Sequence, residues 1–289
     1  MTQPVIAVDM DDVLANTNET LYQWHNKKYS TDLTLQEDAK YFHQWLNRGW
    51  GDEKTTRGKL QAFEESPEWD AIPTEDGAID ALKHLQGLGY SIVVVTARGP
   101  EKARPSQQFL LKHYPDVFDA VYFCKDTEKD EIREAVSEPT KQELFGERGQ
   151  DDEPLPIIWH PGPKSDACKH IGAEFLIDDS VENAFEVIGH GPSGMKVVLF
   201  GPYLWNHQWV DMSKHEFKDL DYDQRMKEGF VDDTSLMDLP DQVVRCVDWP
   251  QVQSFITNEA RRGKRNHQVF RRIQSITSIV RLRVCVEVT

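Results

Sequence analysis

Short apolar runs without alternation constrain the fold of this chain more than any other feature of its sequence. Several of these runs end at a polar or charged cluster. The six runs are PVIAVDMDD (4–12), YSIVVVTARG (90–99), FDAVYFCKD (118–126), AEFLIDDS (173–180), GMKVVLFGP (194–202) and QVVRCVDWP (242–250). Such Val- and Ile-rich runs are typical of strands buried on both faces, as in parallel sheets covered by helices. Helix-like patterns at 100–114 and 181–188 follow two of them. This order predicts an α/β fold with a doubly wound, Rossmann-like parallel sheet.

Two segments interrupt that order, and a tail follows it. Residues 16–73 are helical in composition and rich in aromatic residues, so we expect a helical subdomain inserted after the first strand. Residues 125–156 carry eleven acidic and five basic residues, which indicates a mostly solvated insertion with one or two short helices. Residues 255–289 hold eight Lys and Arg against two Asp and Glu, and form a basic tail without an assigned role. The expected core domain therefore comprises residues 1–15 and 74–254.

Composition excludes several classes of protein. The net charge of −16 argues against nucleic acid as a partner, because a phosphate backbone requires a basic surface. No apolar run approaches the roughly 20 residues of a membrane helix, and the N-terminus has no secretory signal pattern, so a cytoplasmic protein that does not use a membrane is expected. Four scattered cysteines without a CxxC pair suit reduced thiols better than disulfides or a zinc site: Cys124, Cys168, Cys246 and Cys285.

The predicted strand ends carry most of the chemically active side chains. Ligands of an open parallel sheet bind at the carboxyl ends of its strands. The side chains at those ends, or just before them on a helix, are Asp9, Asp11, Asp12, Thr96, Arg98, Lys164, Asp178 and Asp179. Carboxylates that converge from two strands repel one another unless a cation neutralises them. A hard cation with oxygen ligands fits this set, and Mg²⁺ is the usual one when the substrate carries phosphate.

Asp9 and Asp11 lie two residues apart, so a regular strand would place both on the same face. One carboxylate could then attack phosphorus and form an aspartyl-phosphate, while the other supplies a proton to the departing alkoxide. Thr96, Lys164 and the backbone N–H groups after the first strand could stabilise the charge on the transferred phosphoryl group.

At these residues the sequence resembles the haloacid dehalogenase (HAD) superfamily. DMDDV (9–13) matches its first motif, DxDx[TV], and the strand VVVTAR (93–98) matches the second, which ends in Ser or Thr. Lys164 is similar to the single lysine of the third motif, and LIDDS (176–180) matches the acidic pair of the fourth. The four motifs appear in the family's order and span most of the first 180 residues.

The resemblance implies a Mg²⁺-dependent hydrolase of a small phosphorylated substrate. Asp9 is then the nucleophile and a metal ligand, and Asp11 is the general acid and base, with its backbone carbonyl on Mg²⁺. The phosphoryl group is held by Thr96, Ala97 and Lys164. Either Asp178 or Asp179 completes the metal site. Residues 16–73 are then a C1-type cap that closes over the substrate.

Alternative functions remain open at this point. The opening VDMDDVLA also resembles the 5′(3′)-deoxyribonucleotidase branch, which reads DMDGV; this chain has Asp12 in place of that glycine, and its lysine lies further from the acidic pair. A 5′-nucleotidase acting on (deoxy)nucleoside monophosphates is therefore one alternative. A non-catalytic phospho-ligand-binding or regulatory protein with the same fold is another. Carbon–halogen hydrolysis is disfavoured, because the dehalogenase branch generally lacks an acid at the position of Asp11.

Structural interpretations compete with the catalytic ones. Lys125 and Lys169 rival Lys164 for the phosphate role, and Thr96 could simply satisfy backbone groups at a turn. Arg98 could contact the substrate phosphate or form a surface salt bridge. The aromatic residues of the expected cap could stack on a planar substrate, although the core of a small helical subdomain is the more common use. The glycine-rich segment 189–194 follows a helix and precedes a strand, which predicts a turn rather than a phosphate loop.

Overall fold

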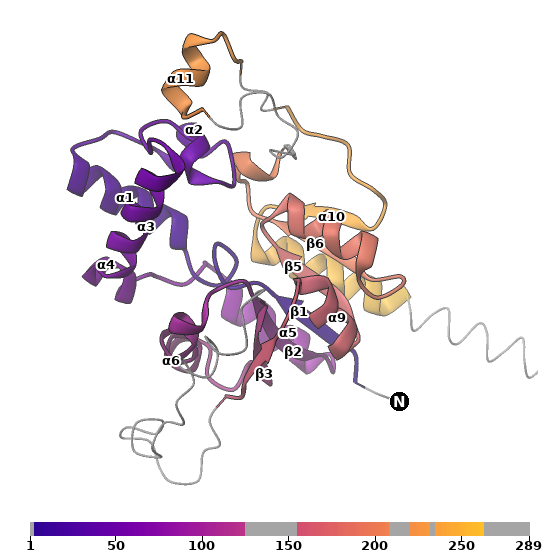
Figure 1. Ribbon diagram of the computed structural model, residues 1–289. Coiled ribbons are helices and arrows are strands. Elements are labelled where there is room, and N and C mark those ends of the chain that lie inside the picture. Colours follow the sequence, from indigo (N-terminus) through magenta and orange to yellow (C-terminus); the bar gives the residue numbers. More distant parts are fainter. Residues whose placement is uncertain (1–2, 125–154, 208–219, 232–234, 263–289) are drawn as a thin grey trace, which may run out of the picture.

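The computed structural model of the protein describes residues 3–124, 155–207, 220–231 and 235–262 (Figure 1). Its strands form one seven-stranded sheet in the order β4-β3-β2-β1-β5-β6-β7, and every neighbouring pair is parallel. The strands are β1 (Val5–Val8), β2 (Ser91–Thr96), β3 (Ala120–Cys124), β4 (Ile157–His160), β5 (Ala173–Asp178), β6 (Lys196–Phe200) and β7 (Val243–Cys246). The predicted α/β class with a Rossmann-like parallel sheet is confirmed.

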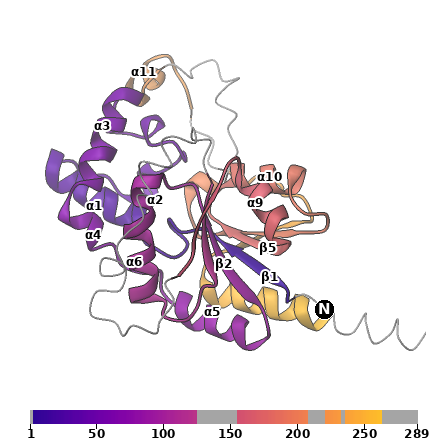
Figure 2. The ribbon, with the colours of Figure 1, turned by 60° about the horizontal axis from the view of Figure 1, so that its bottom comes forward.

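Helices cover both faces of this sheet (Figure 2). Because successive side chains of a strand point to opposite faces, Ile6 and Val8 belong to one apolar core and Ala7 to the other. The first core is closed by α5 (Ala78–Gly87), α6 (Ala103–His113) and a helix over residues 249–262; the second is closed by α9 (Lys164–Ile171) and α10 (Val181–His190). This three-layer packing explains why the strands read as continuous apolar runs.

The order of the strands fixes where a site can form. From β1 the chain adds β2, β3 and β4 on one side, and then crosses to add β5, β6 and β7 on the other. The direction reverses between β1 and β5, which are hydrogen-bonded neighbours. In doubly wound sheets the crevice beyond the carboxyl ends of such a pair is the usual ligand site.

A group of helices separates β1 from α5. It comprises α1 (Thr17–Tyr29), α2 (Leu35–Asp38), a 3₁₀ turn (Gln44–Leu46), α3 (Glu53–Glu64) and α4 (Pro67–Asp70). These helices share an apolar cluster in which Trp24, Trp50 and Phe63 are buried, so core packing is the main use of those rings. Phe42 instead has 48% of its surface exposed. The assignment of residues 16–73 as a cap stays a prediction.

Two features of the fold differ from the sequence-based expectation. Strand β4 was not expected; its four residues are only half-buried at the edge of the sheet and follow the acidic insertion directly. The tail was expected to begin at residue 255, but residues 255–262 continue the helix over 249–262, and Ile256 is fully buried in the first core. The boundary at 254 therefore falls inside a helix that packs on the sheet.

Other expectations agree with the structure or lie outside its described part. The pattern at 100–114 forms a 3₁₀ turn (Pro100–Lys102) and α6, and the segment 189–194 ends α10 and turns into β6. The acidic insertion, apart from its last two residues, and the tail beyond 262 lie outside the described residues. Within the described ranges, no helix combines the length and apolar character that a membrane crossing requires.

Candidate active site

Three carboxylates meet at the point where the strand order reverses. Asp9 follows β1 directly and its backbone N–H donates to the carbonyl of Ile177 on β5, at 2.9 Å. Asp178 ends β5, and Asp179 follows it. All three side chains are buried, and one oxygen from each lies within 4.8 Å of the others. The predicted convergence of acidic residues from these two strand ends is present in the structure.

Lys164 lies between two of these carboxylates. It is the first residue of α9, it is 4% exposed, and its Nζ lies 2.7 Å from Asp9 Oδ1 and 2.7 Å from Asp178 Oδ2. Burial lowers the pKa of Lys164, but the two carboxylates outweigh burial and hold this pKa above its ordinary value. Its rival Lys169 is exposed and lies 3.7 Å from Asp166, and Lys125 is outside the described residues.

One lysine does not fully compensate the charge of this cluster. Burial raises the pKa of Asp9 to about 7; Lys164 opposes this shift, whereas Asp178 adds to it. Burial, together with the charges of Asp12 and Asp178, raises the pKa of Asp179 well above its usual range. A hard cation that binds the carboxylate oxygens stabilises buried negative charges of this kind. The donor set therefore fits Mg²⁺, which prefers carboxylate oxygens and phosphate.

The adjacent aspartates of β5 have different surroundings. Asp178 Oδ1 accepts hydrogen bonds from the backbone of Ser180 at 2.9 Å and from Asn183 at 3.0 Å, and its other oxygen faces Lys164. Asp179 Oδ2 accepts from the indole of Trp205 at 2.8 Å. For the remaining oxygen of Asp179, no hydrogen-bond donor is found within the part of the chain that the structure describes. The contacts of Asp178 therefore mainly orient Lys164, whereas Asp179 keeps one carboxylate oxygen available to bind a cation.

Asp11 is held by a buried arginine. Arg98 donates from Nε to Asp11 Oδ2 at 2.9 Å and from Nη2 to Oδ1 at 2.5 Å, and Thr17 donates to Oδ1 at 2.6 Å. Burial raises the pKa of Asp11, but Arg98 outweighs burial and keeps this pKa below its ordinary value. Because β1 ends at Val8, the regular strand geometry assumed for Asp9 and Asp11 does not extend to them. The Arg98 ion pair is partly buried inside the cavity and is not the surface pair considered from sequence.

Asp12 occupies the position at which the nucleotidase branch has glycine. Its φ of 55° lies in the left-handed region, where glycine is normally preferred and aspartate is tolerated. Its carboxylate accepts from the backbone N–H of Asn18 at 2.8 Å and from the Asn18 side chain at 2.5 Å. This contact fixes the first turn of α1 to the loop after β1, which compensates for the strained backbone.

The second strand brings its predicted residues to the same place. Thr96 is buried at the end of β2, and its hydroxyl accepts from the backbone N–H of Arg98 at 3.2 Å. Thr96 and Ala97 both line the cavity that also contains Asp9 and Lys164. Thr96 thus satisfies a backbone group at the turn, as the structural interpretation held, and still faces the site.

This cavity has a volume of about 410 Å³ and lies between the sheet and the helical group. Asp9, Asp11, Asp179 and other sheet-side residues form its floor, and the helical group contributes mainly apolar and amide side chains: Asn18, Leu21, Phe42, Gln44, Leu60, Phe63 and Trp69. A volume of this size suits a small organic ligand. The cavity therefore combines the acidic cluster and Lys164 with a wall of apolar and amide side chains, to which Glu64, Glu101 and Lys102 add charged groups.

Cationic contacts join the two walls of the cavity. The guanidinium of Arg98 lies 4.8 Å from the ring of Trp69, and the ammonium of Lys102 lies 4.9 Å from the same ring. Lys102 also forms an ion pair with Glu64 at 2.8 Å. These contacts link the loop after β2 to α3 and α4, so both cations on this side of the site already have anionic partners.

Sequence reasoning missed several residues that shape the site. Trp205 follows β6 and lies far along the chain from Asp179, so no local pattern connects the two. Asn183 is more accessible to inference, because it occupies the first turn of the helix that follows the acidic pair. Asn18 and Gln44 carry no motif, and they reach the cavity only through the packing of the helical group.

Comparisons with known proteins give limited information. No family model matches the chain, and no curated protein matches it. Among solved structures, it is similar to a HAD-superfamily hydrolase from Ehrlichia chaffeensis (15% identity, 89% of this chain, 98% of that chain, TM-score 0.39). It is also similar to a predicted phosphatase from Clostridium acetobutylicum (12%, 89%, 100%, 0.43) and to a HAD family hydrolase from Deinococcus radiodurans (13%, 70%, 82%, 0.39). At these identities and TM-scores, the likeness carries no argument about activity.

Proposed function

We propose that this chain is a Mg²⁺-dependent phosphatase of the HAD type, which hydrolyses a small phosphomonoester through an aspartyl-phosphate on Asp9. The observation that carries the proposal is the meeting of Asp9, Asp178 and Asp179 around Lys164 at the end of the sheet. The four sequence motifs that resemble the family are the second support, because they supply these same residues.

Mg²⁺ would be held by Asp9 and Asp179, with the backbone carbonyl of Asp11 as a further ligand. When bound, the ion supplies positive charge that neutralises the carboxylates and binds a phosphate oxygen. Asp178 would keep Lys164 directed at the nucleophile, and the third N–H group of Lys164 would donate to the phosphoryl group. Thr96 and the backbone of Ala97 would hold its other oxygens.

In the first step, a carboxylate oxygen of Asp9 attacks phosphorus, and the bond between phosphorus and the ester oxygen breaks. The departing alkoxide takes a proton, which we assign to Asp11. In the structure Asp11 is paired with Arg98 in its ionised form, so this acid role requires Arg98 to release it. In the second step, water attacks phosphorus, Asp11 takes the proton, and phosphate leaves with regeneration of Asp9.

The substitution Asp9→Asn tests this function directly. We expect phosphate release from an aryl phosphate with Mg²⁺ to fall by about 10³-fold or more, because an amide cannot act as the nucleophile. Asp166→Asn is the matched control, since Asp166 is an exposed residue on α9, and it should retain wild-type turnover. Wild-type turnover in Asp9→Asn would refute the mechanism. A folded wild type that releases no phosphate from any tested ester would favour a non-catalytic ligand-binding protein.

A nucleoside monophosphate is a second candidate substrate, within the same chemistry. The observation that favours it is the pocket wall, where Phe42 exposes its ring beside the amide groups of Asn18 and Gln44. An exposed ring could stack on a base, and amides could hydrogen-bond to its edge. Measuring the kcat/KM of the wild type for sugar phosphates and for nucleoside monophosphates ranks the two substrate classes. Asp9→Asn serves as the inactive control for each substrate.

A further inference from the structure

Arg225 is a fully buried cation outside the site described so far. It lies on α11 (Tyr222–Lys227) and has no exposed surface. Three aromatic rings surround its guanidinium, with centroids 5.0 Å away for Tyr41, 5.1 Å for Phe230 and 5.9 Å for Tyr222. Its Nη2 donates to the backbone carbonyl of Leu46. In the described part of the chain, Nε and Nη1 have no hydrogen-bond partner and no carboxylate pairs with this side chain.

These surroundings show what the arginine does. A buried guanidinium without an anion is expensive to desolvate, and cation–π contacts with several rings offset part of that cost. Such a side chain can join two elements, because its planar group can contact a ring and donate to a carbonyl at the same time. Here Tyr41 and Leu46 belong to the helical group, whereas Tyr222 and Phe230 belong to the segment around α11.

The loop that Arg225 holds is the one that lines the substrate side of the cavity. Residues 41–46 contain Phe42 and Gln44, both of which line the cavity of the candidate active site. The amide of Gln44 donates to Asn18 Oδ1 at 3.0 Å, and Asn18 in turn donates to Asp12. A continuous series of contacts therefore leads from Arg225, through this loop, to the aspartates after β1.

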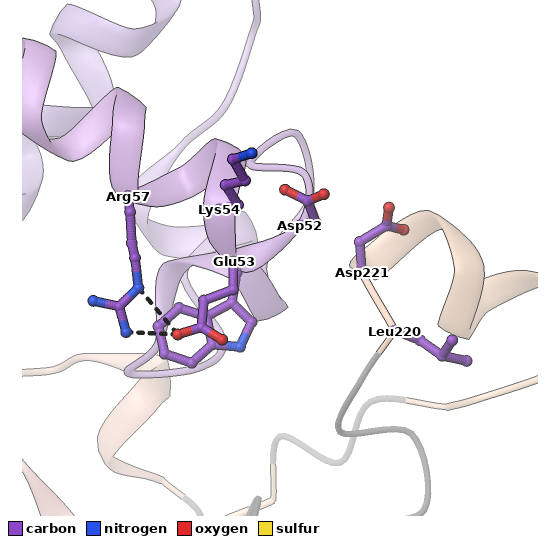
Figure 3. Close-up of a pocket in the computed structure, with 7 residues that line it drawn as sticks. Asp52, Glu53, Lys54, Arg57, Leu220 and Asp221 are labelled. Atoms are coloured by element: carbon purple, nitrogen blue, oxygen red, sulfur yellow. Dashed lines mark hydrogen bonds and ion pairs between the residues drawn. The ribbon is translucent and has the colours of Figure 1, made fainter.

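Next to α3, a cavity separates the segment around α11 from the helical group (Figure 3). Leu220 and Asp221 lie on one side of a cavity of about 430 Å³, and Asp52 and Lys54 at the start of α3 lie on the other. The carboxylate of Asp221 caps α11, and that of Asp52 caps α3, so both are used within their own elements. Within the described residues, the hydrogen bond and the ring contact of Arg225 join the segment to the helical group.

We propose that residues 220–230 act as a strap that holds the substrate-side loop 41–46 in place, with Arg225 as its anchor. Arg225 is then a positioning residue for substrate binding and lies outside the reaction centre. This inference rests on the proposed phosphatase function for its kinetic consequences. In the chain the strap lies between β6 and β7, and it contacts the helical group through Arg225.

The kinetic test compares Arg225→Ala with Arg57→Ala in the full chain, with Mg²⁺ present. Arg57 lines the same gap but is exposed, and within the described residues its ion pair is with Glu53, so it is the matched control. With thymidine 5′-monophosphate as the larger probe, we expect Arg225→Ala to raise KM by about ten-fold and to change kcat less than about three-fold. With p-nitrophenyl phosphate, KM should change less. Arg57→Ala should alter none of these values.

A second measurement does not depend on activity. Amide hydrogen exchange over residues 40–48 should accelerate in Arg225→Ala by about ten-fold or more, and remain unchanged in Arg57→Ala. Arg225→Lys should recover part of both effects, because a lysine retains the charge and can donate to Leu46. If Arg225→Ala does not fold, Arg225→Lys and Tyr222→Leu, which removes one ring, decide the question. Unchanged exchange and unchanged KM in the folded variants would overturn the strap. A wild type without phosphatase activity would refute the proposed function, and exchange alone would then test the strap.

Discussion

At the scale of single residues, the adjacent carboxylates Asp178 and Asp179 share a sequence context but not an environment. Asp178 accepts hydrogen bonds at both oxygens, from backbone, amide and ammonium donors. Asp179 accepts one bond from Trp205 and keeps its second oxygen available. Their surroundings thus separate a group that orients Lys164 from a group suited to bind a cation, a distinction that the sequence left open.

Mg²⁺ affinity should therefore respond differently to the two amide substitutions. We expect Asp179→Asn to weaken Mg²⁺ binding by about 10²-fold, because it removes a charged group that binds the ion directly. Asp178→Asn should weaken Mg²⁺ binding by about ten-fold or less, because Asp178 acts through Lys164. Titration calorimetry of each variant with Mg²⁺ measures this directly. Equal losses in the two variants would show that both carboxylates bind the ion, and a larger loss in Asp178→Asn would reverse the assignment.

At the scale of elements, the strands were predictable and the contacts between distant segments were not. The centres of runs such as 91–96 and 173–178, residues 92–95 and 175–177, are entirely apolar, because helices cover both faces of the sheet, and this pattern can be recognised in one sequence. Arg98 offers no such pattern. Its partner Asp11 lies 87 positions earlier, and only the folded sheet brings β1 and β2 together. The same applies to Trp205 and Asp179.

The helix over residues 249–262 shows how a compositional boundary can mislead. The count of basic residues placed the start of the tail at 255, yet the buried positions Val252 and Ile256 are four apart and share one face of the helix. Trp249, also fully buried, donates from its indole to the carbonyl of Val13 at 2.9 Å. The basic residues of the helix lie on its exposed face, so their number does not indicate where the buried face of the helix ends.

This packing gives a stability prediction. Ile256→Ala should lower the free energy of unfolding by about 2–5 kcal/mol, because it removes a fully buried side chain and leaves a cavity. Asn258→Ala is the control: it lies two residues further on, is exposed, and should change the free energy by less than about 0.5 kcal/mol. Urea unfolding of both variants measures the difference. A loss below 1 kcal/mol for Ile256→Ala would place residues after 254 outside the core, as the sequence suggested.

At the scale of the whole molecule, the buried carboxylates make stability depend on pH and on metal together. Burial raises the pKa of Asp9 to about 7 and that of Glu75 to about 7, and both values are near 4 in an unfolded chain. Between pH 4 and pH 7, these two groups therefore bind more protons in the folded protein than in the unfolded chain. The stability that these groups contribute is therefore complete below pH 4 and is lost as the pH rises through 7.

Without Mg²⁺, we expect the melting temperature to fall between pH 5 and pH 8, and the free energy of unfolding to lose up to about 3 kcal/mol through Asp9 over this range. Saturating Mg²⁺ should reverse much of this loss at pH 8, because an ion that binds only the folded state at 100 times its Kd adds about 2.7 kcal/mol. Thermal unfolding with EDTA and with Mg²⁺, across this pH range, measures both effects.

The variant Asp9→Asn identifies the source of this pH dependence. An amide does not titrate, so the metal-free variant should lose less stability between pH 5 and pH 8 than the wild type, and Glu75 should account for part of what remains. Its response to Mg²⁺ should also weaken, because one ligand is missing. The pH dependence and the response to Mg²⁺ must weaken together if a single cluster causes both. A metal-free wild type whose stability is flat across this range, or a slope that Asp9→Asn leaves unchanged, would mean that Lys164 alone neutralises the site. In that case the folded chain would not need a divalent ion to hold its acidic strand ends together.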